Sequence, residues 1–118
     1  MHPKQRSRRI RYANIVRISM NSKLLTVVAE IVARPGKEDE VRKHLVGFVE
    51  LTRKEKGCVQ YDLHVVNDDH GRFLFYENWD SAEDLDAHAG SEHISAFRSI
   101  SSGLLAQPTR ILRATRIA

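Results

Sequence analysis

Two different spacings of apolar residues alternate along the chain and predict its elements. Residues 24–33 (LLTVVAEIVA) are rich in β-branched side chains and hold no breaker, which predicts a strand buried on at least one face. Residues 34–36 (RPG) end this strand in a turn. Residues 37–56 have the spacing of an amphipathic helix, and Gly57 predicts its end. The apolar face of that helix holds Val41, Leu45, Phe48, Val49 and Thr52.

The middle of the chain shows the strict alternation of a β-hairpin. Residues 58–66 and 72–79 predict the two strands, and the cluster NDDHG at 67–71 predicts the turn. In the first strand one face holds Val59, Tyr61, Leu63 and Val65. In the second, one face holds Phe73, Phe75, Glu77 and Trp79, and the other holds Leu74, Tyr76 and Asn78.

The last third of the chain predicts two short helical segments and a strand. Ser81 and Asp84 resemble a loose capping box before a helix that runs to about Ala89. Gly90 interrupts this helix, and Ser91 with Glu92 caps a second segment. One side of the second segment holds His93, Phe97, Ile100 and Leu104. Residues 109–117 carry three arginines, which predicts a strand near a sheet edge or at a solvated end.

The order strand, helix, strand, strand, helix, strand predicts an α+β, ferredoxin-like βαββαβ domain with an antiparallel sheet. Right-handed crossovers place both helical regions on the same face of that sheet. The opposite face is left half apolar. Because such a face can be buried against a second copy by two-fold symmetry, we expect a homodimer. The apolar residues of this open face are Val28, Val32, Val66, Leu74 and Tyr76.

Composition narrows the class of protein. The chain has 118 residues, 42% of them hydrophobic and 29% charged, which suits one globular domain. No run approaches the roughly 20 apolar residues that span a bilayer, so no membrane association is expected. Cys58 is the only cysteine, so no internal disulfide is possible and a cytoplasmic location is expected.

The charge is concentrated at the N-terminus. Residues 1–22 hold six basic residues and no acid, whereas residues 23–118 hold 13 basic and 15 acidic residues. The first segment lacks an apolar signal core. It fits a flexible basic extension, a transit segment, an arm for nucleic acid or a membrane surface, or sequence upstream of a start at Met20. We expect the domain to occupy residues 23–118, whose slight acidity argues against nucleic-acid binding.

Three segments of this domain carry a resemblance to a known family. They are residues 25–36 (LTVVAEI before RPG), residues 56–62 (KGC before Tyr61 and Asp62) and residues 76–81 (YENWDS), which His88, Ser91, His93 and Phe97 follow. Together they resemble the antibiotic biosynthesis monooxygenase family, including its quinol monooxygenase-like members. The resemblance implies a dimeric α+β barrel. It also implies a monooxygenase that oxidises phenols or quinols with O2 and needs no metal or flavin.

Such chemistry requires a base for the phenol and an apolar pocket. We predict that Trp79, Tyr61, Phe75 and Phe97 wall a substrate-binding pocket between the sheet and the helices. His88 is the predicted catalytic base or hydrogen-bond donor, oriented by Glu77 or His93. The same residues also fit structural roles, Trp79 and Phe97 as core and Glu77 as the partner of an arginine or a helix cap.

No metal or other cofactor is expected. His88 and His93 are five residues apart, about 140° around an ideal helix, so they would not face one ion. A bend at Gly90 would change this geometry. The chain also lacks a cysteine cluster of the kind that holds zinc.

Three other functions stay open beside the cofactor-independent monooxygenase. Haem-degrading relatives carry an axial His late in the second helical region and a Trp before it, where this chain has Arg98 and His88. They also carry an Asn on the first strand, which this chain lacks, so the pattern argues against haem. The remaining alternatives are an isomerase of a phosphorylated sugar with the same fold and a non-catalytic ligand-binding dimer.

Overall fold

The computed structural model describes residues 24–118, so the predictions for residues 1–22 lie outside the described part. Its elements occur in the predicted order. They are β1 (Leu25–Val32), α2 (Glu38–Arg53), β2 (Cys58–Val66), β3 (Asp69–Trp79), α3 (Ala82–Ala89), α4 (Glu92–Ile100), the 3₁₀ turn η1 (Ser101–Gly103) and β4 (Arg110–Thr115). The strands form one antiparallel sheet in the order β2-β3-β1-β4. The predicted α+β ferredoxin-like fold is therefore confirmed.

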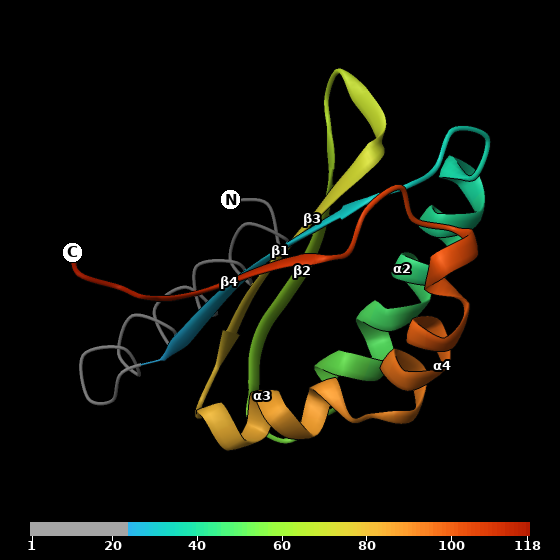
Figure 1. Cartoon of the computed structure of the whole chain (residues 1–118). Helices are drawn as coiled ribbons and strands as arrows, with labels where there is room; N and C mark the ends of the chain where they lie inside the picture. The colour runs from blue at the N-terminus through green and yellow to red at the C-terminus, as the bar shows by residue number, and fades with distance from the viewer. Residues whose placement is uncertain (1–23) are drawn as a thin grey trace, which may run out of the picture.

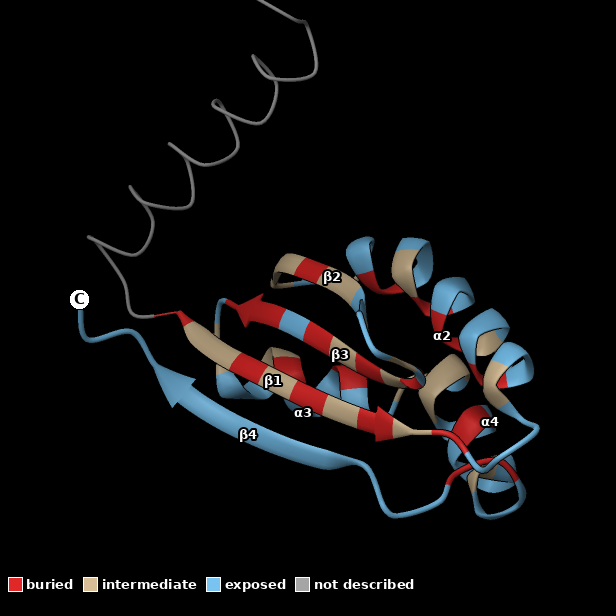
Figure 2. Ribbon diagram, turned by 90° about the horizontal axis from the view of Figure 1, so that it is seen from above, coloured by how far each residue is buried: buried red, intermediate tan, exposed pale blue. Residues whose placement is uncertain are grey.

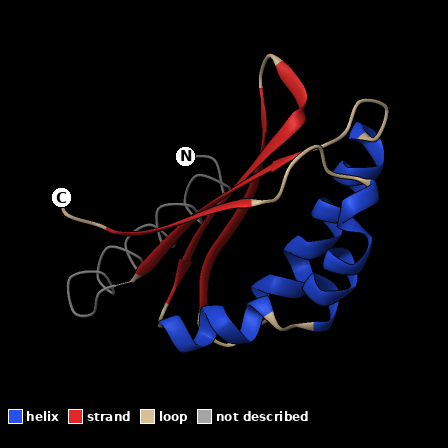
Figure 3. Cartoon of the chain, in the orientation of Figure 1, coloured by secondary structure: helices blue, strands red, loops and turns tan. Residues whose placement is uncertain are grey.

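The described part of the chain has two layers, a sheet and a set of helices. All three α-helices lie on one face of the sheet, and no described element covers the other face (Figures 1 and 3). β4 is an edge strand that is exposed along its whole length (Figure 2), as its arginines predicted. Among the described residues, no helix combines the length and apolar character needed to cross a bilayer.

Alternating side chains of β1 and β3 build the core on the covered face. Val27, Ala29 and Ile31 are buried while the residues between them are only partly so, and Ala29 pairs with Phe75. α2 adds the face that its spacing predicted. Its buried residues are Val41, Leu45, Phe48 and Thr52, and Val49 is partly buried against them.

The hairpin differs from its prediction at both ends. Its turn is Asn67-Asp68, and β3 begins at Asp69 rather than at residue 72. Asp69 fits the strand because its carboxylate accepts bonds from the Gly71 amide and the Arg72 guanidinium. At the other end Val59 is a bulge, since Cys58 pairs with Trp79 and the next pair joins residues 60 and 78. Cys58 therefore packs against the core in place of Val59.

The helix ends also depart from the sequence predictions. α2 ends at Arg53, and the chain turns through Gly57, which has a positive φ of 80°. A side chain at Gly57 would collide with Asp84, so glycine is required where the turn meets α3. Ser81 caps α3 by accepting from the Asp84 amide, as predicted, whereas Ser91 makes no side-chain cap bond. Ile100 was predicted on the apolar side of α4 but is exposed.

Candidate functional site

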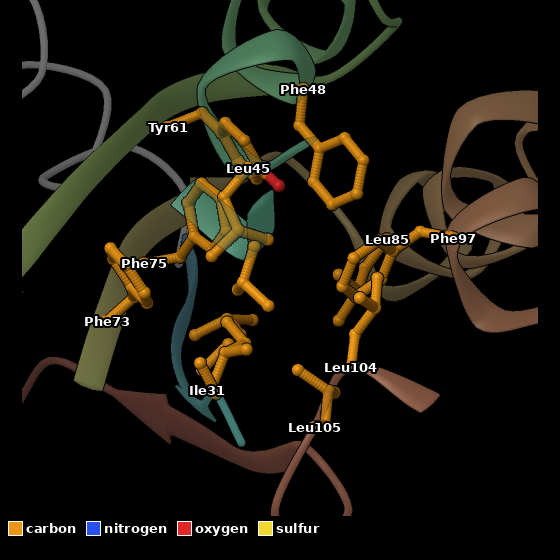
Figure 4. Close-up of a cluster of buried hydrophobic side chains, with 14 of the residues drawn as sticks. Ile31, Leu45, Phe48, Tyr61, Phe73, Phe75, Leu85, Phe97, Leu104 and Leu105 are labelled. Atoms are coloured by element: carbon orange, nitrogen blue, oxygen red, sulfur yellow. The ribbon is translucent and has the colours of Figure 1, made fainter. Parts of the chain in front are cut away.

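A cavity of about 700 Å³ lies between the sheet and the helices. Its inner wall is apolar and comes from the strands, from α2 and from Phe97 of α4. Its outer lining includes exposed residues of α4, η1 and β4, so the cavity opens on that side. In Figure 4 the side chains of Ile31 and Phe75 lie across this space from Phe97. The inner apolar lining includes Val27, Ala29, Ile31, Leu45, Phe48, Tyr61, Phe75 and Phe97.

Three of the four predicted wall residues line the cavity. Tyr61, Phe75 and Phe97 do so, and the rings of Tyr61 and Phe75 stack with centroids 4.6 Å apart. Burial is the main cause that raises the pKa of Tyr61 well above its usual value, so its hydroxyl stays protonated. Trp79 does not line the cavity, and its predicted place in the wall is wrong. It is fully buried and packs against His88 with ring centroids 4.9 Å apart.

His88 lines the cavity and is held by a residue that the sequence did not single out. Its Nδ1 lies 2.7 Å from Oε1 of Glu55, in the turn after α2. The prediction that Glu77 or His93 orients His88 is therefore wrong. Glu55 was missed because it lies in a charged segment typical of a solvated helix end. It is 33 positions away from His88, and only the packing of α3 against that turn joins them.

This pairing determines which ring nitrogen of His88 can act. A carboxylate at Nδ1 favours the tautomer that carries its proton there, as an orienting acid does for a catalytic histidine. Nε2 then keeps a free lone pair. Within residues 24–118 no hydrogen-bond partner is present at Nε2. His88 can therefore accept a proton from a ligand in the cavity.

Glu77 is a second titratable group in the cavity wall. Its exposed fraction is 4%, and it accepts a hydrogen bond of 2.8 Å from Nε1 of Trp79. The expected pairing with an arginine or a helix end is not found, since the indole is the partner. Burial raises the pKa of Glu77 to about 7, with a smaller contribution from the charge of Glu55. Glu77 can therefore exchange a proton near neutral pH.

His93 lies behind the cavity wall and does not line it. Its Nε2 is 2.9 Å from Oγ1 of Thr52 and 3.6 Å from Oε1 of Glu55. The rings of His88 and His93 are 5.9 Å apart. The argument that these histidines diverge is wrong, because Gly90 ends α3 and the two residues lie on different helices. Glu55, His88 and His93 thus converge, each offering one ligand atom within 4.8 Å of the others.

Three arginines stand in the outer lining and were not predicted as site residues. They are Arg34 after β1, Arg98 on α4 and Arg113 on β4. Arg34 and Arg98 donate to backbone carbonyls, and Arg113 pairs with Asp86. Among residues 24–118, Glu77 is the only carboxylate in the lining, so basic side chains outnumber acidic ones around the cavity.

Comparison with known proteins relates this chain to one family. The antibiotic biosynthesis monooxygenase family matches residues 24–99 of the chain. The chain is 32% identical over 87 residues to the "Putative monooxygenase Rv0793" of Mycobacterium tuberculosis, covering 74% of this chain and 85% of that protein. The crystal structure of PA3566 from Pseudomonas aeruginosa superposes with a TM-score of 0.78 at 34% identity, covering 82% and 97% of the two chains.

One relative is considerably longer than the matched segment. The uncharacterized protein sll1783 of Synechocystis is 31% identical over 87 residues, which cover 74% of this chain but 59% of that protein. The match to this relative therefore spans less than two thirds of its length.

Proposed function

Because the chain belongs to the antibiotic biosynthesis monooxygenase family, we propose that it is a monooxygenase that oxidises a phenol- or quinol-type aromatic with O2 and without an added cofactor. The observation that carries this proposal is the His88–Glu55 pair, in which His88 lines an apolar cavity and the partly buried Glu55 holds its Nδ1. The cavity has room for a small aromatic molecule and O2. Its walls present aromatic rings to the substrate and one base to its hydroxyl group.

The reaction begins with the transfer of the substrate hydroxyl proton to Nε2 of His88. Glu55 stabilises the resulting imidazolium at Nδ1. The electron-rich anion then reduces O2, and one oxygen atom forms a bond to a ring carbon in place of hydrogen. The other oxygen atom leaves as water, and a quinol becomes a hydroxyquinone. The substrate supplies all four electrons, so no external reductant is needed.

Glu77 is suited to the proton transfer that completes this reaction. Forming water requires a proton donor near the oxygen that departs. With a pKa of about 7, the Glu77 carboxyl can donate that proton and recover it from solvent. Its bond to Trp79 holds the carboxyl group in the wall during the cycle.

We also propose that the open face of the sheet forms a homodimer. Tyr76 and Leu112 on this face have exposed fractions of 41% and 49%, which is high for apolar residues on a sheet. A Tyr76→Arg variant is expected to be monomeric in analytical ultracentrifugation, because it places like charges across the two-fold axis. The dimer would be contradicted if the wild type already sediments as a monomer and the variant has the same sedimentation coefficient.

The catalytic proposal is tested by oxygen consumption with metal-free protein and a panel of phenols, quinols and anthrones. We expect uptake with at least one class, and a fall in kcat of about 100-fold in His88→Ala, the low end for loss of a general base. Glu55→Gln should also lose activity, whereas His64→Ala, an exposed histidine on β2, serves as the matched control.

Other outcomes would replace this proposal. Oxygen uptake that persists in a His88→Ala, Trp79→Phe double variant would rule out this site. A red-shifted Soret band on adding haemin would favour haem degradation. Turnover of a phosphorylated dicarbonyl sugar without oxygen uptake would favour an isomerase.

A further inference from the structure

We propose that Glu55, His88 and His93 form a binding site for a divalent transition metal of the zinc class, and that a metal bound there switches off His88 as a base. The binding site stands on the geometry alone. The switch rests on the function proposed above. His88 would then be either a metal ligand or a catalytic base, but not both at once.

The three side chains approach one point from three separate elements. Glu55 comes from the turn after α2, His88 from the last turn of α3 and His93 from the first turn of α4. Oε1 of Glu55 lies 2.7 Å from Nδ1 of His88 and 3.6 Å from Nε2 of His93. Ligand atoms around tetrahedral zinc are about 3.3 Å apart, as its bonds of about 2.0–2.1 Å require. The two separations that involve Glu55 lie on either side of this value, and all three ligand atoms lie within 4.8 Å of one another, so side-chain movements of an ångström or two would bring them around one ion.

The donor set and its surroundings suit such a metal. Two imidazoles and one carboxylate are the protein ligands of many zinc sites that keep a fourth position for water. The exposed fractions of the side chains are 8% for His88, 16% for His93 and 21% for Glu55, so bulk water competes little. The rings of Trp79 and Phe48 pack against the two histidines and limit their rotation. At Nε2 of His93 the metal would take the place of the Thr52 hydroxyl. Between Nδ1 of His88 and Oε1 of Glu55 it would take the place of the hydrogen-bonding proton.

Metal binding would change the tautomer of His88. A neutral imidazole that binds a metal through Nδ1 carries its proton on Nε2. Nε2 would then be a donor toward the cavity and could no longer accept the proton of a phenol. Oxygen uptake should therefore fall in proportion to the occupancy of the metal site.

Binding is tested with full-length, metal-free protein titrated with Co²⁺ and followed by visible absorption. We expect one ion per protomer with intense d–d bands, and no thiolate charge-transfer band, because Cys58 is not in the cluster. His93→Ala and Glu55→Gln should weaken binding at least 10-fold, because each removes a ligand. His70→Ala is the matched control, since His70 is an exposed histidine near a different carboxylate, Glu38. Circular dichroism checks that each variant is folded.

The two halves of the proposal fail separately. Equal Co²⁺ binding by folded wild type and His93→Ala, or no binding by the wild type, would overturn the site. The switch is measured as the fold inhibition of oxygen uptake by Zn²⁺, relative to the metal-free rate of each variant. Inhibition that is as strong in His93→Ala as in the wild type would overturn the switch. Absence of oxygen uptake with an intact Co²⁺ spectrum would remove the proposed function and its switch while leaving the metal site.

Discussion

The two faces of the sheet use their polar groups in opposite ways. On the open face, polar side chains bond to one another, across strands from Thr26 to Asn78 to Gln60 and then along β2 to Asp62. One chain of contacts there joins Thr26, Asn78, Gln60 and Asp62, and Arg53 reaches Asp62 from the end of α2. Another joins Glu30, Arg72 and Asp69. On the covered face, Glu77 is alone among apolar and aromatic side chains of the sheet, with the Trp79 indole as its bond donor.

Neighbouring residues of β3 show what this difference means. Asn78 and Glu77 are both buried. Asn78 accepts a bond of 2.7 Å from Thr26 and donates one of 3.0 Å to Gln60, so both ends of its amide are satisfied. Glu77 has one bonded oxygen, and burial raises its pKa to about 7. Burial alone therefore does not mark a functional residue, whereas a buried group with spare proton-exchange capacity does.

The largest expected change in unfolding free energy compares an aromatic residue of the covered face with one of the open face. Phe75→Ala should cost about 3–5 kcal/mol of unfolding free energy, because it opens a void in the core. Tyr76→Ala, one residue along, should cost less than about 1 kcal/mol in a monomer, where that ring is half exposed. Urea unfolding measures both. When the protein is diluted, the loss of unfolding free energy in Phe75→Ala should not change. If Tyr76→Ala costs more in a dimer than in a monomer, its cost should decrease as the dimer dissociates. Equal losses of unfolding free energy in the two variants of the monomer would contradict the difference between the faces.

The second effect concerns the charge of Glu77. Its pKa is near 4.5 when unfolded and about 7 when folded, so the folded state holds the proton longer. Stability from this group is present below pH 4.5 and is lost as pH rises to about 7. Glu77→Gln should therefore stabilise the protein by up to about 3 kcal/mol above pH 7 and flatten this pH dependence, since one pKa unit corresponds to about 1.4 kcal/mol. Urea titrations from pH 5 to 8 measure it, and an unchanged slope would refute the assignment.

The third effect tests the satisfied amide of the open face. Asn78→Ala should destabilise the protein by about 2 kcal/mol, because the Thr26 hydroxyl and the Gln60 amide oxygen lose their partner. The loss should be the same from pH 5 to 8, since none of these three groups titrates. Thr26→Val in the Asn78→Ala background should recover part of it by removing the unpaired hydroxyl. A loss that varies with pH would show that Asn78 is coupled to a titrating group.

The smallest effect tests an ion pair of the open face. Arg72→Gln should lower the free energy of unfolding least of these four changes, because its pair with Glu30 at 2.8 Å is partly exposed and solvent screens it. The difference from the wild type should disappear in concentrated salt, which screens exposed charges. A cost that is large and independent of salt would show that the open face is covered in solution.

Local periodicity explains what could be predicted. The period of two along β3 placed Phe75 and Glu77 on one face, since a strand cannot present neighbours on the same side. The period of α2 identified its buried residues in the same way. The bulge at Val59 was missed because one extra residue shifts the alternation without altering composition. The site was predicted only in part, with His88 in the wall but without Glu55.

The sequence by itself determined the order of elements, the two faces of the sheet and the presence of Glu77 and His88 on the covered side. These follow from short-range spacing, which backbone geometry converts directly into faces. Only the tertiary structure decided that Glu55 orients His88, that Trp79 stands behind the wall and that His93 approaches the same carboxylate. Those contacts depend on how the turn after α2 meets the break at Gly90, and no local spacing encodes the distance between two such segments.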